Sequence, residues 1–111
     1  MTEYELLTRL AVSLAIGLLV GLERGWKTRD EEAGQRAAGF RTFALAGLLG
    51  GASAAIALAY GIAVVGFVFL GFSAAFILFH WLEASIDRTV SVTSVVAGML
   101  TFVLGAYAVL G

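Results

Sequence analysis

The sequence predicts an all-α, polytopic integral membrane protein, folded as a bundle of four transmembrane helices. Only 14% of its 111 residues are charged and 60% are hydrophobic, whereas soluble domains are about a quarter charged and roughly half apolar. Residues 42–82 contain no Asp, Glu, Lys or Arg, and neither do residues 89–111. Because one membrane-spanning helix takes about 20 apolar residues, these two runs are long enough for several spans.

The same composition excludes other classes of protein. A soluble catalytic domain would lack the polar residues to cover its surface, and a net charge of −1 argues against a nucleic-acid partner. Without cysteine there is neither a disulfide nor a thiolate metal site. The sequence has no nucleophile elbow, Walker loop or metal-ligand doublet, so we expect no enzyme and no cofactor, with Mg²⁺ possible as a substrate or ligand. The expected partner is the lipid bilayer.

The uncharged run over residues 42–82 is too long for one span, because 41 residues at ~1.5 Å each would be about twice the bilayer core. We expect it to break at Tyr60–Gly61, where an interfacial aromatic residue precedes a residue suited to a tight turn. The first span is the least apolar, and Arg9 within it is expected to reach the lipid headgroups. A polar loop is expected over residues 26–38 and a short connector over residues 83–91. The four expected spans are residues 4–25, 40–59, 62–82 and 92–110.

The basic residues predict the orientation of the chain. Five of them lie within residues 23–41, and Arg88 lies in the connector that faces the same side of a four-span protein. The opposite side has at most Arg9. Since basic residues accumulate on the cytoplasmic side, we expect both termini to face outward.

Small residues recur at every third or fourth position in the first, second and fourth spans. Such seams let helices approach closely in lipid, and they leave two interpretations open. Either they pack the four helices on one another, or one seam, on the first or fourth span, forms a homodimer interface. Four short helices enclose few pathways, so an oligomer, with a dimer favoured, would suit a transporting function. The seam glycines are Gly17, Gly21, Gly47, Gly51, Gly98 and Gly105.

Polar residues collect at the expected inner ends of the spans, and none of the spans has a carboxylate at its middle. Because a proton-driven transporter usually needs an ionisable group near mid-membrane, this pattern argues against a self-contained proton antiporter. The candidates for an ion site or gate are Glu23, Arg24, Arg41, Thr42, Glu83 and Asp87.

Three interpretations of these polar residues stay open. They could form interfacial ion pairs, Glu23 with Arg41 and Glu83 or Asp87 with Arg88. They could bind a cation, with Glu23 and Asp87 as candidate metal ligands, since Mg²⁺ prefers carboxylate oxygens. The neighbouring arginines could instead bind an anion or a phosphate.

Two motifs flank the polar loop. Residues 17–25 read GLLVGLERG, and residues 38–45 read AGFRTFAL. Together they resemble the hallmark of the MgtC/SapB membrane proteins, in which a GxxxGLER segment ends the first helix and an AGLRT-type segment opens the second. Residues 89–98 are similar to the threonine-rich start of a later helix in that family. The matching positions are Gly17, Gly21, Leu22, Glu23, Arg24, Gly39, Arg41 and Thr42, with Phe40 in place of the usual leucine.

The resemblance implies a bacterial inner-membrane protein associated with magnesium limitation and, in some members, with survival inside host cells. It leaves the activity open between an ion transport or channel module linked to Mg²⁺, a regulatory protein that docks another membrane protein, and a structural fragment of a larger transporter. Typical members carry a further membrane helix and a soluble C-terminal domain. We therefore expect a minimal version of the family or part of a longer protein.

Overall fold

The computed structural model describes residues 2–27, 40–87 and 92–111, without the side chains of Lys27, His80, residues 83–87 and residues 92–94. The described residues fold into four α-helices, which confirms the predicted all-α class and the number of helices. Residues 28–39, including Arg29, Arg36 and Gly39, and residues 88–91, including Arg88, lie outside the described part. The helices are α1 (Glu3–Lys27), α2 (Phe40–Tyr60), α3 (Ala63–Asp87) and α4 (Val92–Leu110).

The start of α1 carries a side-chain cap. The hydroxyl of Thr2 accepts a hydrogen bond from the backbone N–H of Glu5 at 3.1 Å, which satisfies one of the unpaired donors of the first turn. Glu3 and Glu5 lie in that turn, where negative charge is favourable to the helix dipole. Local chemistry therefore fixes the beginning of the first helix.

Two helices are long and apolar enough to cross a membrane, α1 over Glu3–Trp26 and α2 over Phe40–Tyr60. The apolar stretches of α3 and α4 with described side chains, Ala63–Phe79 and Val95–Leu110, are shorter. The longest dimension of the molecule is 45 Å. That length is close to the thickness of a bilayer with its headgroups.

The turn between α2 and α3 lies where the sequence predicts the break. Helix α2 ends at Tyr60, and Gly61 has a φ of 107°, a conformation that is easy only for glycine. The backbone N–H of Gly61 still donates to the carbonyl of Ala57 at 2.8 Å. A single glycine thus ends one helix and redirects the chain into the next.

Gly61→Ala is expected to lower the free energy of unfolding by about 1 kcal/mol, because the new Cβ strains a left-handed backbone. Thermal unfolding in detergent, followed by circular dichroism, would measure this loss. Gly71→Ala is the matched control, since Gly71 lies on α3 and has no positive φ. Equal melting of the two variants would contradict a requirement for glycine at the turn.

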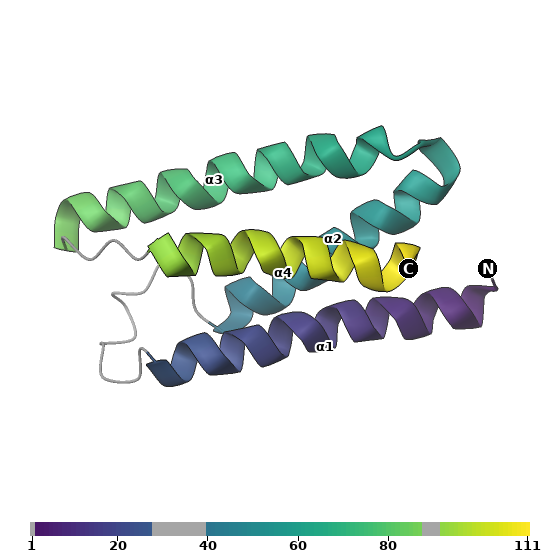
Figure 1. Ribbon diagram of the computed structural model, residues 1–111, viewed down its shortest axis with the longest axis horizontal. Helices are drawn as coiled ribbons and strands as arrows, with labels where there is room; N and C mark the ends of the chain where they lie inside the picture. Colours follow the sequence, from purple (N-terminus) through teal and green to yellow (C-terminus); the bar gives the residue numbers. More distant parts are fainter. Residues whose placement is uncertain (1, 28–39, 88–91) are drawn as a thin grey trace.

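Helices α1, α2 and α4 pack closely on one another, and α3 lies against α2 and α4. The two termini and the α2–α3 turn lie at one end of the molecule (Figure 1). The largest fully buried side chains among the described residues are Phe43, Phe102, Val109, Thr101 and Ser13. The core therefore includes both the α1–α2–α4 contact and the aromatic contacts of α3 with Phe43 and Phe102.

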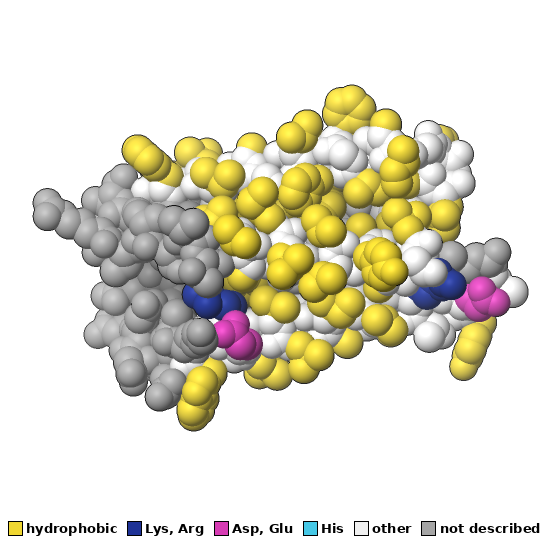
Figure 2. Space-filling view, viewed as in Figure 1, with side chains coloured by type: hydrophobic (Ala, Val, Ile, Leu, Met, Phe, Trp, Pro, Cys, Tyr) yellow, Lys and Arg dark blue, Asp and Glu magenta, His cyan; other side chains and the backbone are white. Residues whose placement is uncertain are grey.

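The outside of the bundle is strongly apolar. Large hydrophobic side chains are exposed along all four helices, including Tyr4 at 81%, Phe67 at 74% and Leu70 at 66%. In the face shown, hydrophobic side chains fill the middle and the charged ones lie toward the two ends (Figure 2). Soluble monomers rarely expose such continuous apolar surface, so this surface suits contact with lipid.

Candidate functional site

The glycine seam of α1 packs directly on the backbone of α2. A Cβ added at Gly17 would strike the backbone of Phe43 and Ala44. From the other side, a Cβ at Gly47 would lie 2.5 Å from the carbonyl oxygen of Ser13 and 3.1 Å from the Cα of Gly17. Only glycine at both positions permits this approach, which is how small-residue seams join helices in lipid.

Helix α4 is held by the same kind of contact. A Cβ at Gly105 would overlap the backbone of Gly47, and one at Gly51 would overlap the side chain of Ser13. Farther along α4, a Cβ at Gly98 would lie 2.7 Å from the ring of Phe76. Helices α1, α2 and α4 therefore meet at one closely packed junction.

The predicted seam glycines all face another helix of the same chain: Gly17, Gly21, Gly47, Gly51, Gly98 and Gly105. Their surfaces are occupied inside the protomer, so a second copy would have to use another face of the bundle. The homodimer itself stays a prediction.

Ser13 adds a buried polar contact to the junction. Its hydroxyl donates to the backbone carbonyl of Gly105 in α4 at 2.8 Å, and the carbonyl of Arg9 lies 3.1 Å from the same oxygen. Hydrogen bonds between membrane helices contribute about 0.6 kcal/mol on average. The Ser13 contact thus fixes the register of α1 against α4 more than it stabilises the fold.

Arg9 has a role that the sequence does not reveal. It is half-buried, and its Nη1 donates to the carbonyl oxygen of Val109 at 2.8 Å, whereas the sequence places this side chain among the headgroups. Carbonyls in the last turn of a helix lack partners within the helix, and a cation there is favourable to the dipole. Arg9 therefore caps α4 from α1.

Arg9→Met is expected to lower the free energy of unfolding by about 1 kcal/mol, since a half-exposed charged hydrogen bond is lost while the side chain keeps similar length. Unfolding in mixed micelles would measure the change. Thr8→Val is the control, because the Thr8 hydroxyl bonds only within α1, to the carbonyl of Tyr4. A larger loss for Thr8→Val than for Arg9→Met would contradict the cap.

At the opposite end of α1, the first motif touches the second. A Cβ at Gly21 would lie 2.8 Å from the carbonyl oxygen of Phe40 and 3.1 Å from its Cα. The end of α1 and the first residue of α2 are therefore in contact, so the two motifs on either side of residues 28–39 lie together. A recess of about 400 Å³ opens at this junction, lined by Gly21, Leu22, Gly25, Trp26 and Phe40.

Four of the six predicted site residues lie within three residues of Gly21 or Phe40, the two residues in contact. Glu23 is exposed and Arg24 is half-buried near the end of α1. Arg41 is exposed and Thr42 is half-buried in the first turn of α2. The two helix ends thus present acidic, basic and hydroxyl groups around one junction.

The other two candidates, Glu83 and Asp87, belong to the last turns of α3 by their backbone, but their side chains lie outside the described part. Among the described side chains, no three His, Asp or Glu residues gather closely enough to hold a metal ion. The ion-pair, cation and anion interpretations of the polar residues all stay predictions, as do Glu23 and Asp87 as metal ligands.

Comparison with known proteins gives one match. The model of the MgtC family matches residues 10–111, which cover the glycine junction, both flanking motifs and α4. No curated protein and no solved structure matches the chain. The match extends over nearly the whole sequence and supports a membrane protein linked to magnesium. From its motifs and this match, the chain belongs to the MgtC family.

Proposed function

We propose that this chain is a four-span protein of the bacterial inner membrane, linked to Mg²⁺, that regulates another membrane protein by docking to it and does not itself conduct ions. The observation that carries the proposal is the closed packing of α1, α2 and α4. An ion needs polar groups along its path, because charge is costly inside a membrane.

Among the described residues, no charged side chain is fully buried inside the bundle, and the buried polar side chains are the hydroxyls of Ser13, Ser53, Ser73 and Thr101. The fully buried rings of Phe43 and Phe102 pack against phenylalanines of α3, and the backbones of α2 and α4 approach too closely at Gly47 and Gly105 to leave a passage. The buried hydroxyl of Ser13 is bonded to a backbone carbonyl. The packing supports a structural unit with functional surfaces on its outside.

Several features support the four-span arrangement. The termini lie at one end of the molecule, as an even number of spans requires (Figure 1). The 45 Å length matches a bilayer with its headgroups, and the exposed surface between the ends is apolar (Figure 2). Residues 63–82 within α3 and residues 92–110 of α4 carry no Asp, Glu, Lys or Arg.

The junction of the two motifs is the docking surface that we propose for the partner. The exposed side chains of Glu23 and Arg41 lie at the helix ends that the positive-inside rule places in the cytoplasm. Charged side chains at the rim of an interface favour a partner with complementary charges over other proteins. The nearby recess beside Trp26 offers an apolar anchor point.

Ion flux separates regulation from transport. Purified protein in liposomes that contain a Mg²⁺ indicator is expected to admit Mg²⁺ no faster than empty liposomes, with a known Mg²⁺ channel as the positive control. Entry above the empty-liposome rate that disappears in Glu23→Gln would overturn the non-conducting proposal.

Growth in low Mg²⁺ tests the docking surface. In a bacterial strain that lacks its own family member, we expect Glu23→Gln and Arg41→Gln to lose the growth that the unaltered chain restores. Glu3→Gln is the matched control, because Glu3 is exposed at the opposite end of α1. Full growth with both junction variants, at equal protein levels, would contradict a role for this surface.

The absence of cysteine from the chain makes its orientation directly measurable. A single cysteine at Glu3 or at Gly111 is expected to react with a membrane-impermeant maleimide added outside the cell. A cysteine at Ala33, in the polar loop, is expected to react only after the membrane is opened. The reverse pattern would overturn the predicted orientation.

A further inference from the structure

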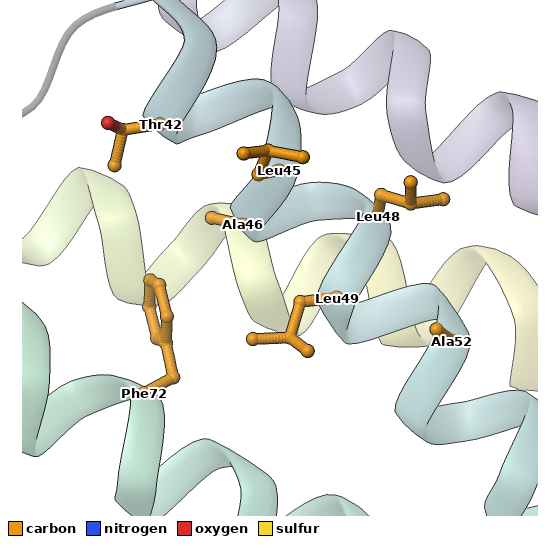
Figure 3. Close-up of a pocket in the computed structure, with 7 residues that line it drawn as sticks. All are labelled: Thr42, Leu45, Ala46, Leu48, Leu49, Ala52 and Phe72. Carbon is orange, nitrogen blue, oxygen red and sulfur yellow. The ribbon is translucent and has the colours of Figure 1, made fainter.

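A groove separates the outer face of α2 from α3. It encloses about 480 Å³ and is open at the side. Figure 3 shows its α2 wall, along which the lining residues follow one another from Thr42 to Ala52, with Phe72 of α3 facing them. All the lining side chains except that of Thr42 are apolar. The lining residues are Thr42, Leu45, Ala46, Leu48, Leu49, Ala52 and Phe72.

The α3 wall of the groove is fixed by aromatic contacts inside the bundle. The ring of Phe72 stacks on Phe102, with centroids 5.4 Å apart, and packs at 5.5 Å against Phe76. Phe102 is fully buried and Phe76 is buried. Since the ring of Phe72 is fixed by these contacts, it cannot easily turn to fill the space, and the groove is a formed feature of the bundle.

The length of the groove identifies its occupant. From Thr42 to Ala52 the helix rises ten residues, or about 15 Å. That is roughly half of the ~30 Å hydrocarbon core, so the groove reaches from one membrane face to the bilayer midplane. A transmembrane helix, from a partner or from a second copy, would need a contact surface along the full ~30 Å of the hydrocarbon core. An acyl chain of one leaflet extends only to the bilayer midplane, which matches the length of this groove.

The charge at the mouth of the groove complements a phosphate. Arg41 directly precedes Thr42, the first lining residue on α2, and its side chain is exposed, so it belongs to the turn of α2 at which the groove begins. Arginine binds phosphate through paired N–H donors, and basic pockets beside membrane helices on the cytoplasmic side bind anionic headgroups. Among the described side chains near the α1–α2 junction, Arg24 and Arg41 outnumber Glu23.

We propose that this groove binds one acyl chain of an anionic phospholipid from the cytoplasmic leaflet, with the lipid phosphate on Arg41. The inference rests on the proposed membrane placement, in which the Arg41 end of α2 lies at the cytoplasmic headgroups. The bound chain fills the space between α3 and the α1–α2–α4 core. The position of α3 is thereby coupled to the lipid that surrounds the protein.

Native mass spectrometry of the detergent-purified chain, titrated with phosphatidylglycerol or phosphatidylethanolamine, tests the proposal. We expect one phosphatidylglycerol to be retained in preference to phosphatidylethanolamine. Ala52→Phe adds a ring at half-buried Ala52, at the end of the groove nearest the bilayer midplane. It is expected to weaken retention about tenfold, as overpacking of an occupied site does. Arg41→Gln is expected to remove the preference between the headgroups. Ala74→Phe, on the exposed face of α3, is the matched control and should retain the lipid.

Unchanged retention in Ala52→Phe, or equal loss in Ala74→Phe, would overturn the proposal. Loss of a dimer mass in Ala52→Phe, with lipid retention intact, would show instead that the groove holds a second copy.

A phosphatidylglycerol with a diazirine at the middle of its acyl chain gives a second readout on the unaltered protein. Adducts on residues 45–52 and on Phe72 support the proposal, whereas adducts spread over all exposed faces overturn it. Both measurements use no flux and no growth assay. The lipid proposal can therefore be overturned while the regulatory proposal stands, and the regulatory proposal can be overturned while lipid binding is confirmed.

Discussion

Gly105→Ala is expected to lower the free energy of unfolding by about 3 kcal/mol, the upper range for overpacking a closed interior. The new Cβ would overlap the carbonyl of Gly47 and lie 3.1 Å from its Cα. The clash involves backbone on both sides. Gly47 cannot retreat, because it already lies against Ser13 and Gly17 of α1.

Equilibrium unfolding in mixed micelles, followed by circular dichroism, would measure this effect. Gly66→Ala is the matched control, since Gly66 is exposed on α3 and a Cβ there would meet no described atom within 4 Å. Alanine is the better helix former, so the control should be as stable as the unaltered chain or slightly more stable. If Gly105→Ala unfolds together with this control, α2 and α4 do not meet at Gly47.

Phe102→Ala is expected to cost about 3 kcal/mol, as is typical of a buried phenylalanine that leaves a cavity. Phe102 is completely buried, and its ring centroid lies 5.3 Å from that of Phe69 and 5.4 Å from that of Phe72. Both partners belong to α3. The substitution therefore removes the main aromatic contact between α3 and the rest of the bundle.

The expected result is a lower unfolding midpoint together with faster proteolysis near the α2–α3 turn. Phe67→Ala is the control, because Phe67 lies on the same helix as the two partners but is 74% exposed. A surface change of this kind usually stays within about 0.5 kcal/mol. Equal losses from Phe67→Ala and Phe102→Ala would contradict an aromatic attachment of α3.

The helices and the turn between α2 and α3 could be predicted because their signals are local. An uncharged run too long for one span has to break, and Tyr60–Gly61 combines an interfacial side chain with the residue that accepts a positive φ. The contact between Gly21 and Phe40 is also local in effect. Both residues flank one connector, so the motifs on either side of it are brought to the same end of the molecule.

The partners of each seam could not be predicted. Small residues at helical spacing show that another helix can pack closely there, but they do not show which helix it is. Gly47 illustrates this, since its backbone contacts both α1 and α4. Arg9 shows the same limit for polar groups. Its acceptor, the carbonyl of Val109, is a backbone atom 100 residues away. Because every residue has a backbone carbonyl, the sequence does not indicate which one accepts the bond.

The bonds from Arg9 to Val109 and from Ser13 to Gly105 join α1 to α4 across 100 and 92 residues. Domains form from the N-terminus as the chain is synthesised, so α1 is made long before its partners in α4 exist. During that interval the half-buried guanidinium and the core hydroxyl have to be satisfied by water, lipid or the insertion machinery. The order of synthesis therefore makes α4 the element that completes these contacts, and the packing of α1 reaches its final register only after α4 has been synthesised.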